Sequence, residues 1–191
     1  MFKKILLVVI FLVFLVGLVY VILPGAKDVE YFSPIPNSKR SELDGDTWQN
    51  PNLKAYFADV DRIYITNFYR EQFEKSLIPG IRIPSIRINR PPEEAYRYVR
   101  DQQESTFLEE YVFPFRESIF VNGYEPVIEN MMFNKQRSYD GDHIIYQGVH
   151  YDAKATLRYY PSDWVVRVGV YLLLWMSLIA TYKITIRVIK D

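Results

Sequence analysis

The chain has 191 residues, a formal net charge of +0 and no cysteine, and 49% of its residues are hydrophobic. Without cysteine it has neither a disulfide framework nor a lipoprotein anchor at its amino end. Residues 24–163 hold 17 of the 23 basic residues and 22 of the 23 acidic ones, a mild negative excess without a basic patch. This balance argues against nucleic acid as a partner.

The first element is an uncharged apolar run of nineteen residues, 5–23, that follows Lys3 and Lys4. As a helix it would span about 28 Å and favour insertion into a bilayer by about 5 to 10 kcal/mol. A cleaved signal peptide is the alternative, but its apolar region is usually about 7 to 15 residues long. Cleavage after Ala26 would also place Pro24 at an unsuitable position. We therefore expect an uncleaved signal anchor.

The last element, residues 164–182, is an apolar run of the same length but a weaker one, because it contains Arg167. Asp163 before it is a good helix N-cap, and Trp164 and Tyr182 are aromatic residues at its two ends, where a membrane has its interfaces. A basic tail, 183–191, follows. The pattern predicts a second transmembrane helix.

Two membrane spans require both chain ends to lie on one side of the membrane. Basic residues flank the two runs at those ends, so the positive-inside rule places residues 1–4 and 183–191 in the cytoplasm. Residues 24–163 are then expected to be extracytoplasmic, and the chain to form a two-pass hairpin in the plasma (inner) membrane. Such short cytoplasmic segments are not expected to hold a catalytic module.

Counting depth along the two runs pairs Gly17 with Gly169, each about 8 to 9 Å below the outer edge. The same count pairs Tyr20 with Arg167. One hypothesis is close packing at the glycines, with the Tyr20 ring or hydroxyl receiving Arg167. The alternatives are that Arg167 reaches the outer headgroups or a charged partner subunit, and that the glycines have no packing role.

Residues 24–58 are expected to form an extracytoplasmic tether, because prolines punctuate them at positions 24, 34, 36 and 51. Residues 59–163 are expected to form a small α+β domain in which about two helices pack on a mostly antiparallel sheet. A segment of this size can bury a hydrophobic core.

The first helix of the domain is expected to begin at Asp59 and to end near Ser76, although residues 59–66 could also form a strand. Its apolar residues offer a broad apolar face and are Val60, Ile63, Tyr64, Ile65, Phe68 and Phe73. A second helix is expected over Glu93–Val112, where oppositely charged residues recur four apart. Pro114 closes it.

The strand signals are shorter. Residues 81–88 alternate in polarity with a change of phase at Pro84, which predicts a bulged strand at a sheet edge. Asn122-Gly123 lies between apolar residues and predicts a hairpin turn. Residues 127–140 are ambiguous between helix and strand.

Residues 142–160 predict a hairpin followed by a strand. A two-residue turn at Gln147-Gly148 sets a register in which directly opposed residues share a face. The opposed pairs are Tyr146 with Val149, Ile145 with His150, Ile144 with Tyr151 and His143 with Asp152. The resulting apolar face carries Ile144, Tyr146, Val149, Tyr151, Ala153, Ala155, Leu157 and Tyr159, and this stripe supports the register.

The same register brings both histidines of the chain, His143 and His150, beside Asp152 on the polar face. Two imidazoles and a carboxylate can hold zinc with an open position for an activated water, which defines a metallohydrolase hypothesis. A solvent-facing strand with two incidental histidines is the alternative, and we favour it because no other ligand or catalytic motif accompanies the three residues. No catalytic or cofactor-binding residue is assigned.

These patterns favour a non-enzymatic two-pass membrane protein whose extracytoplasmic domain binds a partner, as an accessory or scaffold subunit of a cell-envelope membrane complex. Its expected partners are the lipid bilayer and either another membrane protein or a second copy of the chain. The alternatives are an extracytoplasmic ligand-binding or sensing module and the metallohydrolase built on His143, His150 and Asp152.

Overall fold

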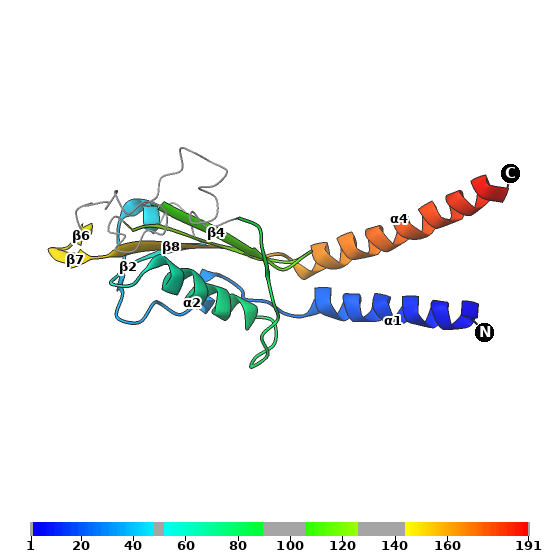
Figure 1. Cartoon of the computed structure of the whole chain (residues 1–191), viewed down its shortest axis with the longest axis horizontal. Helices are drawn as coiled ribbons and strands as arrows, with labels where there is room; N and C mark the ends of the chain where they lie inside the picture. The colour runs from blue at the N-terminus through cyan, green and yellow to red at the C-terminus, as the bar shows by residue number, and fades with distance from the viewer. Residues whose placement is uncertain (1, 48–51, 90–105, 126–143, 191) are drawn as a thin grey trace, which may run out of the picture. The chain divides into compact units, whose positions relative to one another are not determined.

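The computed structural model describes residues 2–47, 52–89, 106–125 and 144–190. They belong to two compact units, which are described separately (Figure 1). The helix pair comprises residues 1–24 and 162–191, and the folded domain comprises Gly25–Pro161. The described part of the chain has three α-helices and a mostly antiparallel sheet, which confirms the predicted α+β class.

The helix pair consists of α1, Phe2–Ile22, and α4, Trp164–Lys190. Both helices are long and apolar enough to cross a membrane. Asp163 caps α4, because its carboxylate accepts a hydrogen bond of 2.7 Å from the backbone N–H of Val165. The helix continues past Tyr182 to its end at Lys190, so most of the expected basic tail is helical.

The folded domain is built on a six-stranded antiparallel sheet with the strand order β1-β2-β8-β5-β4-β3. Its strands are β1 Lys39–Arg40, β2 Leu53–Ala58, β3 Ile86–Arg87, β4 Thr106–Val112, β5 Ser118–Tyr124 and β8 Ala153–Tyr160. Two short 3-10 helices, η1 Val29–Tyr31 and η2 Asp44–Asp46, precede β2. Because β8 lies between β2 and β5, the last strand joins the amino-terminal strands to the rest of the sheet.

Burial in β8 alternates as the sequence predicts. Ala153, Ala155, Leu157 and Tyr159 are buried, and the residues between them are only partly buried. Side chains on a strand point alternately to the two faces of a sheet, so this pattern means that one face carries the core. The predicted apolar face of this strand is confirmed.

Helix α2, Arg62–Glu74, covers that face. The carboxylate of Asp61 caps it by accepting the backbone N–H of Tyr64 at 2.6 Å, so the helix starts later than Asp59 and residues 62–66 are not a strand. Ile65, Tyr69 and Phe73 are fully buried, and the ring of Phe73 stacks on that of Phe113 with centroids 4.4 Å apart. Three residues of the predicted apolar face are not part of this buried row: Ile63, Tyr64 and Phe68.

The expected tether, residues 24–58, is instead part of the folded domain from Gly25 onwards. Val29, Phe32 and Ile35 are buried, and all six residues of β2 are buried. Phe32 packs edge-on against Tyr159, with ring centroids 5.2 Å apart. Apolar residues between Pro24 and Pro36 are therefore part of the core of the folded domain.

The expected helix Glu93–Val112 falls partly outside the described residues. Its last seven residues, Thr106–Val112, form strand β4 rather than helix and pair along their whole length with β5. Phe107, Glu109 and Tyr111 are buried in alternation. Pairing with β5 and burial against α2 thus outweigh the local helical preference of this segment.

The expected hairpin turn at Asn122-Gly123 is also absent, because both residues lie within β5. A side chain at Gly123 would collide with the carbonyl oxygen of Lys154 and with the ring of Phe107. The glycine therefore permits a close approach within the sheet instead of a turn. The edge position predicted for residues 81–88 is confirmed for β3, although only Ile86–Arg87 are paired there.

The predicted hairpin around Gln147-Gly148 is confirmed in its register. β6 Ile144–Tyr146 pairs with β7 Val149–Tyr151 in the expected way, and both turn residues have positive φ angles, 51° and 78°. The hairpin forms a separate two-stranded sheet, so its apolar residues do not continue the buried face of β8. The ring of Tyr146 stacks on Phe57 at 4.2 Å, whereas Val149 is exposed.

Candidate functional sites

The two helices of the helix pair meet through three aromatic residues. Phe14 of α1 stacks on Tyr171 of α4, with ring centroids 5.8 Å apart, and meets Trp175 edge-on at 5.5 Å. The Tyr171 hydroxyl donates a hydrogen bond of 2.9 Å to the backbone carbonyl of Phe14. A polar group is thus hidden between two apolar helices, which is the arrangement that lipid surroundings favour.

Gly17 is the small residue that makes this contact fit. A side chain at Gly17 would overlap the hydroxyl and ring of Tyr171, whereas space within 4 Å of a side chain at Gly169 is empty. The expected packing of the two glycines on each other is therefore not present. Gly17 instead receives a large ring from α4, half a turn beyond Gly169, so only one of the two glycines has a packing role within the chain.

Arg167 lies inside the helix pair and is only 6% exposed. Its Nη2 donates to the backbone carbonyl of Leu23, 3.3 Å away, at the end of α1. Carbonyls at a helix carboxyl end lack intrahelical donors and carry partial negative charge, so a guanidinium there is stabilising. The expected pairing of Arg167 with Tyr20 stays a prediction.

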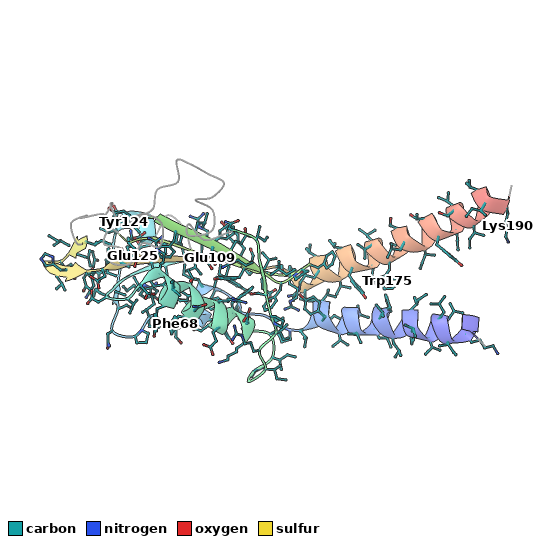
Figure 2. The ribbon with its side chains drawn as sticks, in the orientation of Figure 1. Phe68, Glu109, Tyr124, Glu125, Trp175 and Lys190 are labelled. Carbon is teal, nitrogen blue, oxygen red and sulfur yellow. The ribbon has the colours of Figure 1, made fainter. Side chains whose placement is uncertain are left out.

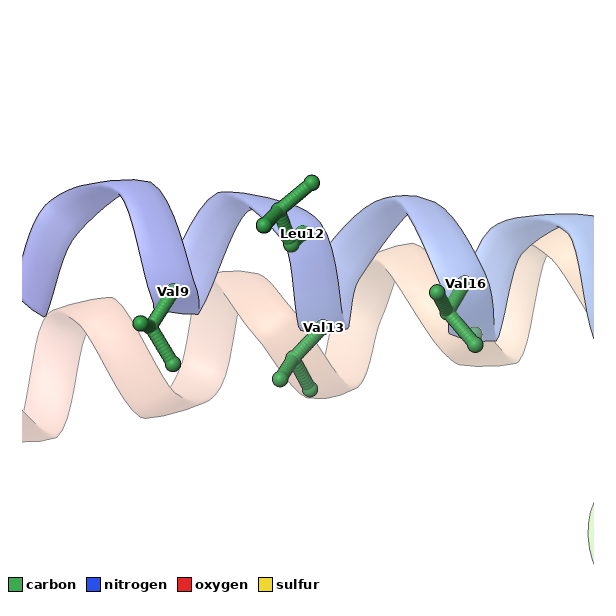
Figure 3. Close-up of a pocket in the computed structure, with 5 residues that line it drawn as sticks. Val9, Leu12, Val13 and Val16 are labelled. Carbon is green, nitrogen blue, oxygen red and sulfur yellow. The ribbon is translucent and has the colours of Figure 1, made fainter.

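An apolar groove, which we call the furrow, runs along α1 and includes Gly17, the residue that contacts Tyr171 (Figure 3). Its volume is about 430 Å³, and its lining consists of Val9, Leu12, Val13, Val16 and Gly17. These positions recur every three to four residues and therefore lie on one side of the helix. The furrow can accept a lipid acyl chain or apolar side chains, but no polar group in its lining would select between them.

Glu74 is a buried carboxylate of the folded domain with several hydrogen-bond donors. It is 1% exposed and accepts hydrogen bonds from Arg70, Arg82 and Ser85 at 2.5 to 3.0 Å. Burial alone would raise its pKa, but the hydrogen bonds from Ser85, Arg82 and Arg70 outweigh that effect and hold the pKa below its usual value. A carboxylate that stays ionised in this way anchors the segment after α2 and is a poor proton acceptor.

Further charge pairs tie α2 and the sheet edge together. Arg62 is paired with Glu125, and both side chains are buried. Glu109 accepts a hydrogen bond from the Tyr111 hydroxyl and lies 3.7 Å from Arg87. Burial and the neighbouring Glu109 raise the pKa of Tyr111 above its usual value, so its hydroxyl remains protonated. These pairs satisfy one another, which indicates a structural network.

The outer side of α2 carries an unusual apolar surface. Ile63 is 61% exposed and Tyr64 is 44% exposed, and the ring of Tyr64 stacks on Phe68 with centroids 6.0 Å apart and planes 14° apart. Figure 2 shows Phe68 on this outer side of the helix. We call these three residues the α2 stripe. This stripe was not predicted from the sequence. The signal for it is that α2 has more apolar residues than one face of the sheet can bury.

The metal hypothesis gains no support in the part of the chain that the structure describes. No group of three or more His, Cys, Asp or Glu residues that could hold a metal ion occurs there. His150 is exposed on β7, and the backbone N–H of Asp152 donates to Asp59 Oδ1 at 3.3 Å. His143 lies outside the described residues, so the three-residue site stays an untested prediction.

None of the family models, curated proteins or solved structures compared with the chain matches it. The residues and their geometry therefore carry the functional inference.

Proposed function

We propose that this chain is a non-enzymatic two-pass membrane protein whose extracytoplasmic domain binds a partner protein, as an accessory or scaffold subunit of a membrane complex. The α2 stripe is the observation that carries the proposal. A large, pre-stacked aromatic pair flanked by an exposed isoleucine is costly in water, and such surfaces mark protein contacts.

Residence in a membrane is supported by the side chains of the helix pair. Leucine, isoleucine and valine residues along α1 and α4 are largely exposed, including Leu7, Val16, Leu173 and Val188. An apolar surface of this extent favours lipid as its surroundings, because in water it would drive aggregation.

The proposed orientation places both ends of the chain in the cytoplasm of the plasma (inner) membrane. Lys3 and Lys4 lie at the start of α1, and Arg187 and Lys190 lie in the last turns of α4. Positive residues are retained on the cytoplasmic side of membrane helices. Residues 24–163 are then extracytoplasmic, and the α2 stripe is open to proteins of the envelope or of the same membrane.

The partner is proposed to present an apolar pocket that receives the Tyr64 and Phe68 rings. Stacked rings lose little conformational freedom when they bind, because the free protein already holds them together. A second copy of the chain is the homomeric form of the same proposal. The polar end of the same helix, where Lys75 pairs with Glu71 at 2.5 Å, would form the rim.

Photo-cross-linking in native membranes tests this proposal. A photoreactive amino acid at Tyr64, which is 44% exposed, is expected to form one discrete cross-linked product. The same amino acid at Tyr124, which is 41% exposed at the end of β5, is expected to form at least fivefold less of that product. The triple variant Ile63→Ser, Tyr64→Ser, Phe68→Ser should lose co-purification of that product's partner in mild detergent. Equal cross-linking at Tyr64 and Tyr124, or a complex that survives the triple variant, would contradict the proposal.

A further inference from the structure

The chain enters and leaves the folded domain at the same end of the sheet. It enters at Gly25 and leaves after Tyr160, the last residue of β8. The hydroxyl of Tyr159 donates a hydrogen bond of 2.9 Å to the backbone carbonyl of Ala26, which holds the two chain segments together. This end of the domain is therefore the one joined to both helices.

The turn between β4 and β5 lies at this same end. Ser118, the first residue of β5, is directly opposite Tyr160 in the antiparallel register. The turn residues 113–117 therefore project from the sheet beside the exit of the chain. We refer to them as the 113–117 turn.

Phe115 at the tip of this turn is in an unfavourable position by two criteria. Its ring is 52% exposed, and its φ angle is 61°, in the region that favours glycine. The Arg116 backbone N–H donates to the Phe113 carbonyl at 2.9 Å, so Pro114 and Phe115 occupy the two central positions of a tight turn. Glycine or asparagine is usual where the second central residue has a positive φ angle.

A buried ion pair fixes the direction of the tip. The side chains of Arg116 and Glu117 are almost fully buried and lie 2.9 Å apart. The Glu117 carboxylate lies so close to Gly25 that any side chain at that glycine would collide with it. The turn is thus locked to the residue at which the chain enters the domain, and its exposed phenylalanine cannot easily fold back.

We propose that Phe115 inserts into the headgroup and upper acyl region of the outer leaflet, so that the 113–117 turn is a membrane-contacting foot of the domain. The inference rests on the proposed membrane residence of the helix pair. Three residues separate Tyr160 from the first residue of α4, and three extended residues span about 10 Å. The end of the sheet that carries Phe115 therefore lies within reach of the bilayer surface.

The chemistry of the tip fits this occupant. A phenylalanine ring gains free energy on transfer from water to the membrane interface, and this gain offsets the backbone strain at Phe115. Tyr160, exposed beside the turn, is an amphipathic ring of the kind found at membrane interfaces. A foot of this kind would hold the folded domain at a fixed height, with the α2 stripe at a defined distance from the membrane.

Depth-dependent fluorescence quenching tests the foot, and the absence of cysteine makes the labelling free of background. The full chain is reconstituted in phosphatidylcholine–phosphatidylglycerol vesicles with an NBD fluorophore on Phe115→Cys. The matched control is Tyr124→Cys, at the opposite end of the β4–β5 pair and similarly exposed. We expect lipids with shallow nitroxide labels to quench the Phe115 label at least threefold more than the Tyr124 label.

Two more labelled variants make the outcomes distinguishable. A label at Phe115 could distort the turn that it reports on. Tyr160→Cys leaves the native Phe115 in place, and we expect shallow nitroxides to quench its label as well. Val170→Cys in α4 reports on membrane insertion and is expected to be quenched by deep nitroxides. One outcome would overturn the foot alone: deep nitroxides quench the Val170 label, but shallow nitroxides quench the Phe115 and Tyr160 labels no more than the Tyr124 label. Absence of quenching at Val170 would overturn the proposed membrane residence and the foot with it.

Discussion

The helix pair and the folded domain of this chain are organised in opposite ways. In the helix pair the apolar side chains are exposed, and the polar groups of Arg167 and Tyr171 are hidden in the contact between helices. In the folded domain the aromatic and aliphatic residues of α2 and β8 are buried, and most charges face outward. This difference indicates that the two units are adapted to different solvents, with lipid expected around the first unit and water around the second.

The comparison has exceptions in the folded domain, and two of them are the functional candidates. The α2 stripe and Phe115 are exposed apolar surfaces on the unit that is otherwise organised for water. Each is held in place by structure beneath it, the first by ring stacking and the second by the buried Arg116–Glu117 pair. Exposed apolar groups that are held in place in this way are suited to contact another molecule, which we propose to be a partner protein for the α2 stripe and the membrane for Phe115.

The largest expected effect concerns the buried charge of the folded domain. Glu74→Ala would leave Arg70, Arg82 and Ser85 without their shared acceptor and is expected to lower the free energy of unfolding by about 3 to 5 kcal/mol. Glu71→Ala is the matched control, because Glu71 is exposed and paired only with Lys75 on the same helix. Urea unfolding of the full chain in mild detergent, followed by circular dichroism, measures both. Equal losses would mean that burial does not distinguish the two carboxylates.

The helix pair provides the next effect. Gly17→Leu would force Tyr171 away from Phe14 and is expected to weaken the helix contact by about 1 to 3 kcal/mol. Gly169→Leu has open space and should change it little. The contact can be followed by SDS titration with Trp175 fluorescence, after Trp48 and Trp164 are replaced by phenylalanine. A larger loss for Gly169→Leu would indicate that this glycine packs against another molecule.

A smaller effect of opposite sign is expected at the tip of the 113–117 turn. Phe115→Gly relieves the positive φ angle and should raise the free energy of unfolding of the folded domain by up to about 1 kcal/mol in detergent. The same variant should weaken contact with vesicles, seen as reduced nitroxide quenching of a label on Tyr160→Cys. Lower stability in Phe115→Gly would show that the ring packs within the domain.

The smallest effect is a change in pH dependence. The pKa of Glu74 is lowered in the folded state, so its stabilising contribution is complete above the unfolded-state value of about 4.3 and is lost as the pH falls through the folded-state pKa. In Glu74→Gln the melting temperature is therefore expected to fall less than in the unmodified protein when the pH is lowered below about 4.3. Melting temperatures measured from pH 7 to pH 3 test this, and parallel curves for the two proteins would contradict it.

Sequence patterns predicted the features that depend on neighbouring residues. The period of β8, the turn at Gln147-Gly148 and the Asp163 cap all follow from local chemistry, and all are confirmed. The predictions that were wrong concern residues whose structure depends on contacts between distant segments. Gly123 resembles a turn residue until the Phe107 ring and the Lys154 carbonyl are placed against it, and Thr106–Val112 resembles a helix until β5 pairs with it.

The candidate surfaces divide in the same manner. Arg167 was identified from the rarity of a charge in an apolar run, but its acceptor, the Leu23 carbonyl, depends on how two helices 144 positions apart meet. Ile63 and Tyr64 could be identified from the sequence as apolar but not as exposed, because the sheet decides which side of α2 is covered. Phe115 offered only Pro114 as a turn signal, and its positive φ angle follows from closure of the β4–β5 pair.

The two long apolar helices and the α+β class of the domain between them could be predicted from the sequence, because hydrophobic period and length are properties of consecutive residues. The division of the apolar residues into core and surface became clear only from the folded structure. Folding brought β1 and β2 into the sheet, turned the α2 stripe outward and set Phe115 beside the entry and exit of the chain. These outcomes depend on strand pairing between remote segments, where burial and close packing outweigh local preference.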